Sequence, residues 1–179
     1  MGCHGGFSLD DSVRRTWYNP EAILNNIGLK AGMIFMDIGC GDGFFSLLAA
    51  KMIGRAGKVF AVDIDAGAIE KLKRKADEQG LENIQAVVGA GEDTVFCNGC
   101  ADIVFYSMVL HDFKDPKKVL FNARQMLKPN GLIVDLDWKK KQMSFGPPAH
   151  IRFSEEYASD LIKQAGLMVK EVKEAGPYH

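Results

Sequence analysis

A short loop rich in glycine constrains this chain more than any other part of its sequence. The loop runs from Asp37 to Gly43 with the sequence DIGCGDG, between an apolar run and a segment expected to be helical. Glycines at alternate positions let the backbone turn tightly and let a ligand lie against the main chain. The helix that begins near Gly43 would point free N–H groups and the positive end of its dipole at the same place. The loop therefore predicts a ligand site between a strand and a helix.

Strands and helices alternate along the rest of the chain. The expected strands are Met33–Ile38, Lys58–Asp63, Asn83–Val88, Asp102–Ser107, Gly131–Asp137 and Leu167–Val172. The expected helices are Glu21–Ile27, Phe44–Ile53, Ala68–Gln79, one that begins at Pro116 and one that follows Ser154 and runs through Ala165. Strict alternation implies parallel strands with helices on both faces, so the sequence predicts a doubly wound, mostly parallel α/β sheet. Ligands of such sheets bind at the carboxyl ends of the strands.

The composition is that of an ordinary globular domain. Of the 179 residues, 47% are hydrophobic and 25% are charged, which excludes a disordered chain and a collagen-like fibre. The 22 basic and 23 acidic residues leave a net charge of −1, so we expect neither nucleic acid nor a membrane as a partner. The four cysteines, without a recognisable secretory signal, indicate reduced thiols and a cytoplasmic protein. We expect one domain over residues 1–179.

An acidic residue at the end of the second strand narrows the choice of ligand. Asp63 lies at the distance from the glycine loop, about 20 residues, at which a carboxylate accepts hydrogen bonds from both hydroxyls of a ribose. The pair indicates an adenosine-containing ligand; the alternative is that Asp63 only caps the following helix. A dinucleotide is disfavoured because Phe44 stands where that motif has its third glycine. Asp37 would also repel a pyrophosphate, whereas it would attract an ammonium group.

Five segments resemble, in order, the motifs of class I S-adenosylmethionine (SAM)-dependent methyltransferases, most nearly the small stand-alone, ubiquinone-methylase-like type. They are MDIGCGDGFFSLLAA, KVFAVDID, VVGAGEDTVF, ADIVFYSMVLHDFKDPKKVL and MLKPNGLIVDLDW. The resemblance extends from Asn19 to Gly176. It implies a Rossmann-like methyltransferase fold, SAM as cofactor and S-adenosylhomocysteine (SAH) as product. It also implies in-line transfer of the sulfonium methyl group to a small-molecule acceptor.

The resemblance also implies which residues hold the cofactor. They are Asp37, Gly39, Gly41 and Gly43 around the methionine part, Asp63 at the ribose, Ile64, Gly91 and Glu92 at the adenine, and Ser107 near the reactive methyl group. Ala90 departs from the family pattern, because an acid that commonly accepts from the adenine amino group often stands there. The backbone N–H of Gly91 and the side chain of Glu92 are the expected substitutes.

The sulfonium is already a good leaving group, so holding acceptor and methyl group in line can supply most of the catalysis. If the acceptor must lose a proton, His111 is the first candidate base and His150 the second; a structural role for His111 is the alternative. The segment 138–153 is expected to form an acceptor-side loop, lined by Trp138 and Phe145. Residues 1–30 form an N-terminal arm and helix, whose Arg14 and neighbouring side chains either form a lid or have no special role.

The sequence leaves several alternatives open. The chain stops at His179, where the family has an antiparallel seventh strand beside the fifth. We therefore expect either a truncated chain or an incomplete sheet, whose exposed edge would offer a surface for a homodimer. A SAM- or SAH-binding module without turnover is the alternative function, and thiol-assisted methylation of a metalloid such as arsenite is a more distant one. Cys97 and Cys100 would serve the latter, or flank a plain turn, and we assign no metal site.

Overall fold

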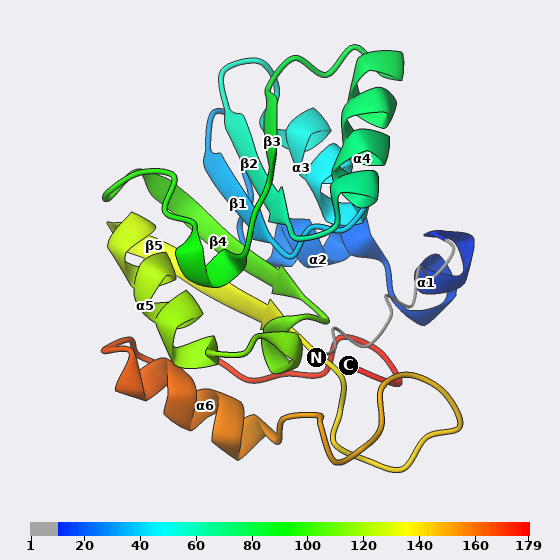
Figure 1. The fold of residues 1–179 in the computed structure, drawn as a ribbon, viewed down its shortest axis with the longest axis vertical. Coiled ribbons are helices and arrows are strands. Elements are labelled where there is room, and N and C mark those ends of the chain that lie inside the picture. The colour runs from blue at the N-terminus through cyan, green and yellow to red at the C-terminus, as the bar shows by residue number, and fades with distance from the viewer. Residues whose placement is uncertain (1–10) are drawn as a thin grey trace.

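The computed structural model describes residues 11–179, which form a parallel sheet with helices on both faces (Figure 1). The strands are β1 (Ile34–Ile38), β2 (Lys58–Asp63), β3 (Ile84–Val88), β4 (Ala101–Ser107) and β5 (Leu127–Leu136). They lie in the order β3-β2-β1-β4-β5, and all four pairings are parallel. The first strand therefore lies in the middle, and the chain winds outward from it in both directions. This arrangement confirms the predicted doubly wound α/β fold.

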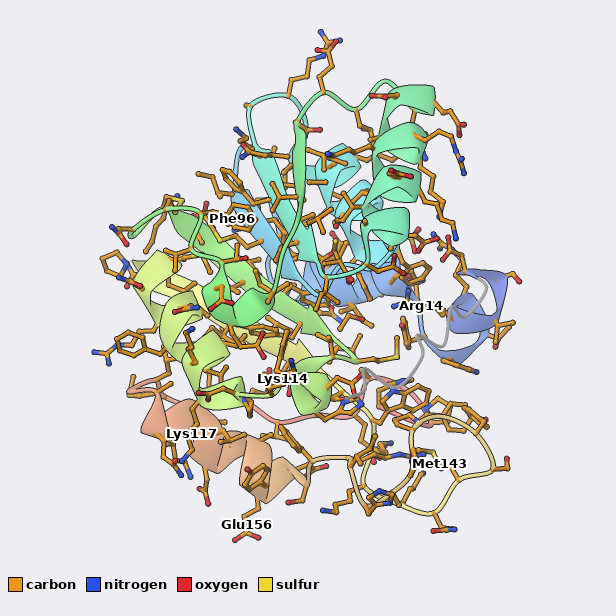
Figure 2. The ribbon with its side chains drawn as sticks, viewed as in Figure 1. Arg14, Phe96, Lys114, Lys117, Met143 and Glu156 are labelled. Atoms are coloured by element: carbon orange, nitrogen blue, oxygen red, sulfur yellow. A yellow bond between two sulfur atoms is a disulfide. The ribbon has the colours of Figure 1, made fainter. Side chains whose placement is uncertain are left out.

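The helices divide between the two faces of the sheet. They are α1 (Asp11–Trp17), α2 (Pro20–Asn26), α3 (Phe44–Ile53), α4 (Ala66–Glu78), α5 (Pro116–Met126) and α6 (Glu155–Gln164), with short 3₁₀ turns η1 (Gly91–Asp93) and η2 (Leu110–Asp112). Side chains of α2, α3 and α4 pack on one face, and those of α5 and α6 pack on the other. Lys117 of α5 and Glu156 of α6 are exposed, as an amphipathic pattern requires (Figure 2).

Side-chain caps fix where the helices begin. Asn19 accepts a hydrogen bond from the N–H of Ala22 at the start of α2, and Asp115 does the same for Lys118 at the start of α5. Ser154 caps α6 by accepting from the N–H of Tyr157. All three boundaries agree with the sequence prediction to within a residue. Helix α1, by contrast, was not predicted.

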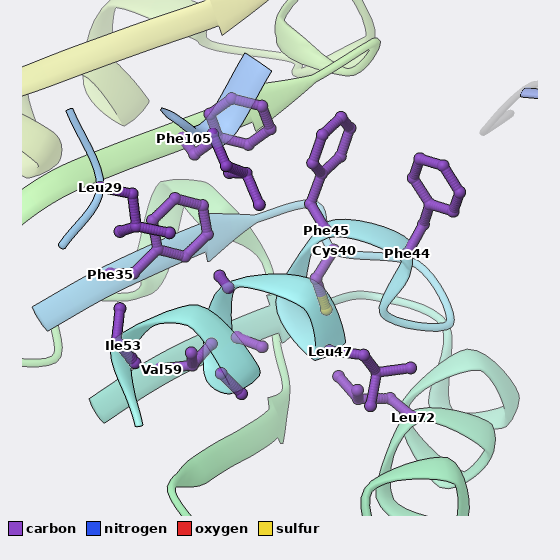
Figure 3. Packing of buried hydrophobic residues seen from close by; sticks show 14 of the residues in the cluster. Leu29, Phe35, Cys40, Phe44, Phe45, Leu47, Ile53, Val59, Leu72 and Phe105 are labelled. Carbon is purple, nitrogen blue, oxygen red and sulfur yellow. The ribbon is translucent and has the colours of Figure 1, made fainter. Parts of the chain in front are cut away.

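Aromatic rings fill the core between the sheet and α3 (Figure 3). The ring of Phe105 in β4 lies 5.5 Å from that of Phe35 in β1 and 4.7 Å from that of Phe45 in α3, centroid to centroid. All three side chains are buried. Helix α3 is apolar on nearly every side because the sheet covers one side and α2 and α4 contact the others. This packing holds the start of α3, and the glycine loop before it, against the carboxyl ends of the strands.

The last part of the chain differs from the sequence prediction. Residues 167–172 form no strand, so the predicted sixth strand is wrong. The family resemblance also implies an antiparallel seventh strand beside the fifth. No such strand occurs in residues 11–179, and β5 is an edge of the sheet. Residues 167–172 therefore have no neighbouring strand with which their backbone could form hydrogen bonds.

The cysteine prediction is also wrong in part. Cys97 and Cys100 are joined by a disulfide across the turn at Gly99, which has φ 64°. Neither sulfur is then a free thiolate for a metal or a metalloid. Cys40 is a buried free thiol. Cys3 and His4, the two further ligands that a metal site at Cys97 and Cys100 would need, lie outside the described residues. Within residues 11–179, no helix is long and apolar enough to cross a membrane.

Candidate functional site

A cavity of about 720 Å³ opens at the carboxyl ends of β1, β2 and β4. Its walls come from the glycine loop, α1, the segment around η2, and the loop formed by residues 138–153. Of the residues singled out in the sequence, those that line it are Arg14, Asp37, Gly39, Gly41, Phe44, Asp63, Ser107, His111, Trp138 and Phe145. The cavity is therefore where a doubly wound sheet is expected to bind its ligand.

The glycine loop can follow its path only because two positions lack a side chain. Gly39 has φ 77°, and a Cβ atom there would lie 2.6 Å from Cγ2 of Val109. Gly43 has φ 92°, and a Cβ atom there would collide with the side chain of Leu72. Both conformations are left-handed, which other residues adopt at a cost in free energy. The loop thus exposes its backbone to the cavity between Asp37 and α3.

Asp63 fixes this loop from the end of β2. Its Oδ2 accepts a hydrogen bond of 2.7 Å from the N–H of Gly41, and its Oδ1 accepts one of 2.9 Å from the N–H of Asp65. The carboxylate retains further lone pairs for donors in the cavity. Asp65, not Asp63, is the N-cap of α4, because its side chain accepts from the N–H groups of Gly67 and Ala68. The alternative that Asp63 serves only as that cap is therefore wrong.

Asp37 presents a buried acceptor to the cavity. Its Oδ2 accepts a hydrogen bond of 2.6 Å from Oγ of Ser46, whereas its Oδ1 is buried and has no hydrogen-bond partner among the described residues. Burial and the nearby charge of Asp63 raise the pKa of Asp37 to about 6, although Ser46 and Arg14 act in the opposite direction. A buried oxygen without a donor fits a cationic group entering from the cavity.

Four predicted cofactor residues lie outside the cavity lining: Gly43, Ile64, Gly91 and Glu92. Ile64 is 61% exposed beside Asp63. Gly91 is buried, and a Cβ atom there would lie 2.8 Å from the ring of Phe113. Oε1 of Glu92 accepts a hydrogen bond of 3.0 Å from the N–H of Lys114, just before α5. Their roles at the adenine stay predictions.

The imidazole of His111 borders the opposite part of the cavity and pairs with Asp137. Its Nδ1 lies 2.8 Å from Oδ1 of Asp137, and its Nε2 lies 3.6 Å from Oδ1 of Asp112. Burial alone would lower the pKa of His111, but the hydrogen bond and charge of Asp137 and the charge of Asp112 outweigh burial and raise it. His150 is exposed and does not line the cavity. Of the two candidate bases, His111 therefore borders the cavity and His150 does not.

An aromatic cluster forms a roof over the part of the cavity that the loop 138–153 lines. The Trp17 ring stacks on Phe145 at 5.4 Å and meets Trp138 edge-on at 5.5 Å. The Tyr178 ring lies 4.6 Å from Phe145, and the His179 ring lies 4.6 Å from Trp138. The roof thus joins α1, the loop 138–153 and the last described residues.

Arg152 organises this loop from inside it. The residue is 2% exposed, and its guanidinium donates hydrogen bonds to the carbonyl oxygens of Lys139, Lys141, Phe145 and Pro147. These bonds hold the backbone on both sides of Phe145 in one conformation. Sequence reasoning missed Arg152, since a lone arginine in a polar loop carries no distinguishing pattern.

Comparison with known proteins identifies relatives for most of the chain. A family model described as a methyltransferase domain matches residues 29–175. The chain is 30% identical over 125 residues to nocamycin O-methyltransferase of Saccharothrix syringae, covering 69% of this chain and 45% of that protein. It is 25% identical over 167 residues to a ubiquinone/menaquinone biosynthesis C-methyltransferase of Francisella tularensis subsp. novicida, covering 93% and 64%. The chain spans about half the length of the curated relatives it matches.

A solved structure extends the similarity to nearly the whole fold. The chain resembles a SAM-dependent methyltransferase from Aquifex aeolicus with a TM-score of 0.85 and 28% sequence identity. The match covers 96% of this chain and 95% of the other. The glycine loop, Asp37 and Asp63 therefore lie in a fold that a SAM-dependent enzyme shares.

Proposed function

This chain belongs to the class I SAM-dependent methyltransferases, and we propose that its acceptor is a small, largely apolar molecule whose reacting atom carries a proton. The observation that carries the proposal is one continuous cavity, with Asp37 and Asp63 at one part and His111 at another. Bound SAM supplies an electrophilic methyl group on a sulfonium that is already a good leaving group. The chain's own residues have to bind the cofactor and the acceptor, hold the two in the right orientation, and exclude water.

We propose that the cofactor is held at the glycine loop. The unpaired Oδ1 of Asp37 would accept from the ammonium group of the methionine part. Asp63 would accept from the ribose hydroxyls while keeping its bond to the N–H of Gly41. Gly39 and Gly41 would allow close approach of the backbone, and Ser107 would lie near the transferred methyl group. Gly43 would position α3, with Ile64, Gly91 and Glu92 beyond the cavity at the adenine.

The acceptor would lie beneath the aromatic roof. The lining there is mostly apolar and includes Met108, Val109, Trp138, Phe145, Pro147, Pro148 and Ile151. Such walls favour a flat apolar molecule and exclude water from the reacting atoms. Because Nδ1 of His111 is held by Asp137, Nε2 is the ring atom left to take a proton from the acceptor.

The named relatives differ in the atom they methylate. One is an O-methyltransferase and another a C-methyltransferase. A buried histidine–carboxylate pair favours an acceptor that is deprotonated as it reacts, and a hydroxyl on an aromatic ring fits both the base and the apolar walls. We therefore propose O-methylation of a hydroxylated aromatic compound.

Transfer of label from [methyl-³H]SAM tests this proposal. The acceptor panel consists of phenol, catechol, naphthol and dihydroxynaphthalene, each beside its fully O-methylated ether, which has no hydroxyl left, as a control. We expect label in one or more hydroxyl compounds and none in the ethers. His111→Ala should lower the rate about 100-fold or more, while His150→Ala should leave it close to wild type. Binding of SAH without transfer to any compound, or equal rates for both variants, would contradict the proposal.

A further inference from the structure

A disulfide lies at the end of the sheet opposite the cavity. It joins Cys97 to Cys100 across two exposed residues, and β4 begins directly after it. The cavity opens at the carboxyl ends of the parallel strands, and neither cysteine lines it. Figure 2 labels Phe96, the residue before the disulfide, well away from Arg14, which lines the cavity. The proposed methyl transfer therefore has no use for this disulfide.

Hydrogen bonds and packing hold the turn between the two cysteines without help from the disulfide. The N–H of Gly99 donates to the carbonyl oxygen of Gln125 at 3.0 Å. The N–H of Cys100 donates to the carbonyl oxygen of Met126 at 2.9 Å, so the turn is docked on the end of α5. The ring of Phe96 packs against a phenylalanine ring of β2, with 5.0 Å between the centroids. Opening the S–S bond leaves these contacts available, so the turn can pass between disulfide and dithiol while the domain stays folded.

A disulfide in so short a loop adds little to the stability of the fold. Disulfides stabilise mainly by restricting the unfolded chain, and the restriction is smallest when few residues lie between the cysteines. Here only two residues separate Cys97 from Cys100. Both cysteines are half-buried beside exposed neighbours, so the turn is accessible from solvent. Accessible disulfides are the ones that are readily reduced, whereas those shielded in a core are not.

Cys40 provides the contrast within the same chain. Its thiol is free, lies in the glycine loop and is 7% exposed. Burial and the charges of Asp37 and Asp63 raise its pKa well above the usual range. Because the thiolate is the reactive form, Cys40 is a poor nucleophile. Exchange chemistry among residues 11–179 is thus confined to Cys97 and Cys100.

We propose that the Cys97–Cys100 disulfide is a thiol–disulfide exchange site, whose substrates are soluble thiols. The inference goes beyond the proposed function and does not depend on it, because the disulfide and the cavity lie at opposite ends of β4. The Cα atoms of the two cysteines lie 6.1 Å apart in a turn that its own hydrogen bonds hold. The second sulfur therefore stays beside the first when the bond opens, as an exchange site requires.

The exchange takes place in two steps that balance in atoms and electrons. The thiolate of one substrate molecule attacks one sulfur of the disulfide and forms a mixed disulfide, and the other cysteine leaves as a thiolate that takes up a proton. The thiolate of a second substrate molecule then attacks the substrate sulfur of the mixed disulfide, which frees the first cysteine. Two thiols are oxidised to one disulfide, and the protein disulfide is reduced to two thiols. A substrate disulfide, acting as oxidant, restores the starting state by the reverse steps.

Reduction of the folded wild type tests the proposal. The protein is incubated at neutral pH with glutathione or dithiothreitol and alkylated with N-ethylmaleimide, and mass spectrometry of its peptides reads each cysteine separately. We expect Cys97 and Cys100 to be alkylated at least about tenfold faster than Cys40, which is reached only when the core opens. The circular dichroism spectrum should stay unchanged, and glutathione disulfide should restore the disulfide. Reduction by glutathione identifies a monothiol as a substrate, and reduction by dithiothreitol alone identifies a dithiol; both results support the site.

Single serine variants isolate the intermediate. Cys97→Ser and Cys100→Ser each keep one sulfur in the turn, so no neighbouring cysteine can displace glutathione from a mixed disulfide. We expect incubation with glutathione disulfide to leave glutathione on the remaining cysteine of the turn in each variant. Cys40 should carry none and is the matched control within the same chain.

Alkylation of Cys97 and Cys100 only as fast as that of Cys40 would overturn the proposal, because the disulfide would then open only with the fold. Loss of the circular dichroism spectrum on reduction would overturn it as well, since the disulfide would be structural. So would the absence of glutathione from both serine variants, or a wild type whose two cysteines stay thiols in the presence of glutathione disulfide.

Discussion

Nδ1 of His111 lies 2.8 Å from Oδ1 of Asp137. The histidine follows β4 and the aspartate follows β5, so the pair joins the carboxyl ends of two neighbouring parallel strands. The N–H of Trp138 also donates to Oδ1 of Asp137, at 2.7 Å, which fixes the carboxylate further. The sheet itself thereby sets the orientation of the imidazole, with Nδ1 toward Asp137 and Nε2 3.6 Å from Oδ1 of Asp112.

The Asp137→Asn variant should lower the pKa of His111. In wild type the carboxylate raises this pKa above its ordinary value of about 6.5, and without its charge the effect of burial dominates. Protonated His111 stabilises wild type fully below about pH 6.5, and this stabilisation is lost as the pH rises through the folded-state pKa. Titration of the His111 imidazole by NMR, in wild type and in the variant, checks the prediction. Equal midpoints for His111 in wild type and variant would contradict it.

Binding of SAH should release a proton from Asp37. Burial raises the pKa of this carboxyl to about 6, and a bound ammonium group favours its ionised form. We expect roughly half a proton per site to be released at pH 6, and affinity to rise between pH 5 and pH 7. Calorimetry in two buffers of different ionisation enthalpy measures the release.

5′-Methylthioadenosine is the matched ligand because it lacks the ammonium group, and Asp37→Asn is the matched variant because it cannot titrate. Neither should show the release. If SAH released the same number of protons from Asp37→Asn as from wild type, Asp37 would not be the titrating group.

The strands and helices that frame the site were predictable because their signals are local. The apolar runs of β1 and β2, the glycines before α3 and the caps Asn19 and Asp115 each specify an element within a few residues. Residues 167–172 show where such signals fail, because an apolar run becomes a strand only if another strand pairs with it. The predicted start of β5 at Gly131 was wrong for a similar reason. Leu127 pairs with Ala101 of β4, so the strand begins four residues earlier than expected.

The site was predictable in part for the same reason. Asp37, Gly39, Gly41 and Asp63 belong to a motif of fixed spacing, and the structure brings all four to the cavity. The sequence prediction ended a strand at Asp137 but gave this residue no role. Its position at the end of the strand next to β4 could have indicated that it pairs with His111. Arg152 gave no signal, since its contacts depend on the conformation of the whole loop 138–153.

Arg152→Met should unfold or loosen that loop. The substitution leaves four backbone carbonyls without their donor, so we expect a loss of about 3 kcal/mol in the free energy of unfolding. The Tm should fall by roughly 6–12 °C, and the fluorescence of Trp138 should shift toward that of exposed tryptophan. Arg74→Met is the control, because the Arg74 side chain is 68% exposed and its one ion pair among residues 11–179 is with Glu78, at 3.8 Å. Equal Tm values for the two variants would show that Arg152 does not hold the loop.

Calorimetric titration of wild type and Asp63→Ala with SAH tests the central claim most directly, namely that the carboxyl ends of β1 and β2 hold the cofactor. Wild type should bind one SAH per chain, and Asp63→Ala should bind at least tenfold more weakly, a loss of about 1.4 kcal/mol or more. The variant also loses the bond to the N–H of Gly41, so circular dichroism must show that it remains folded. A folded Asp63→Ala with wild-type affinity, or no binding to wild type at millimolar SAH, would contradict this account of the site.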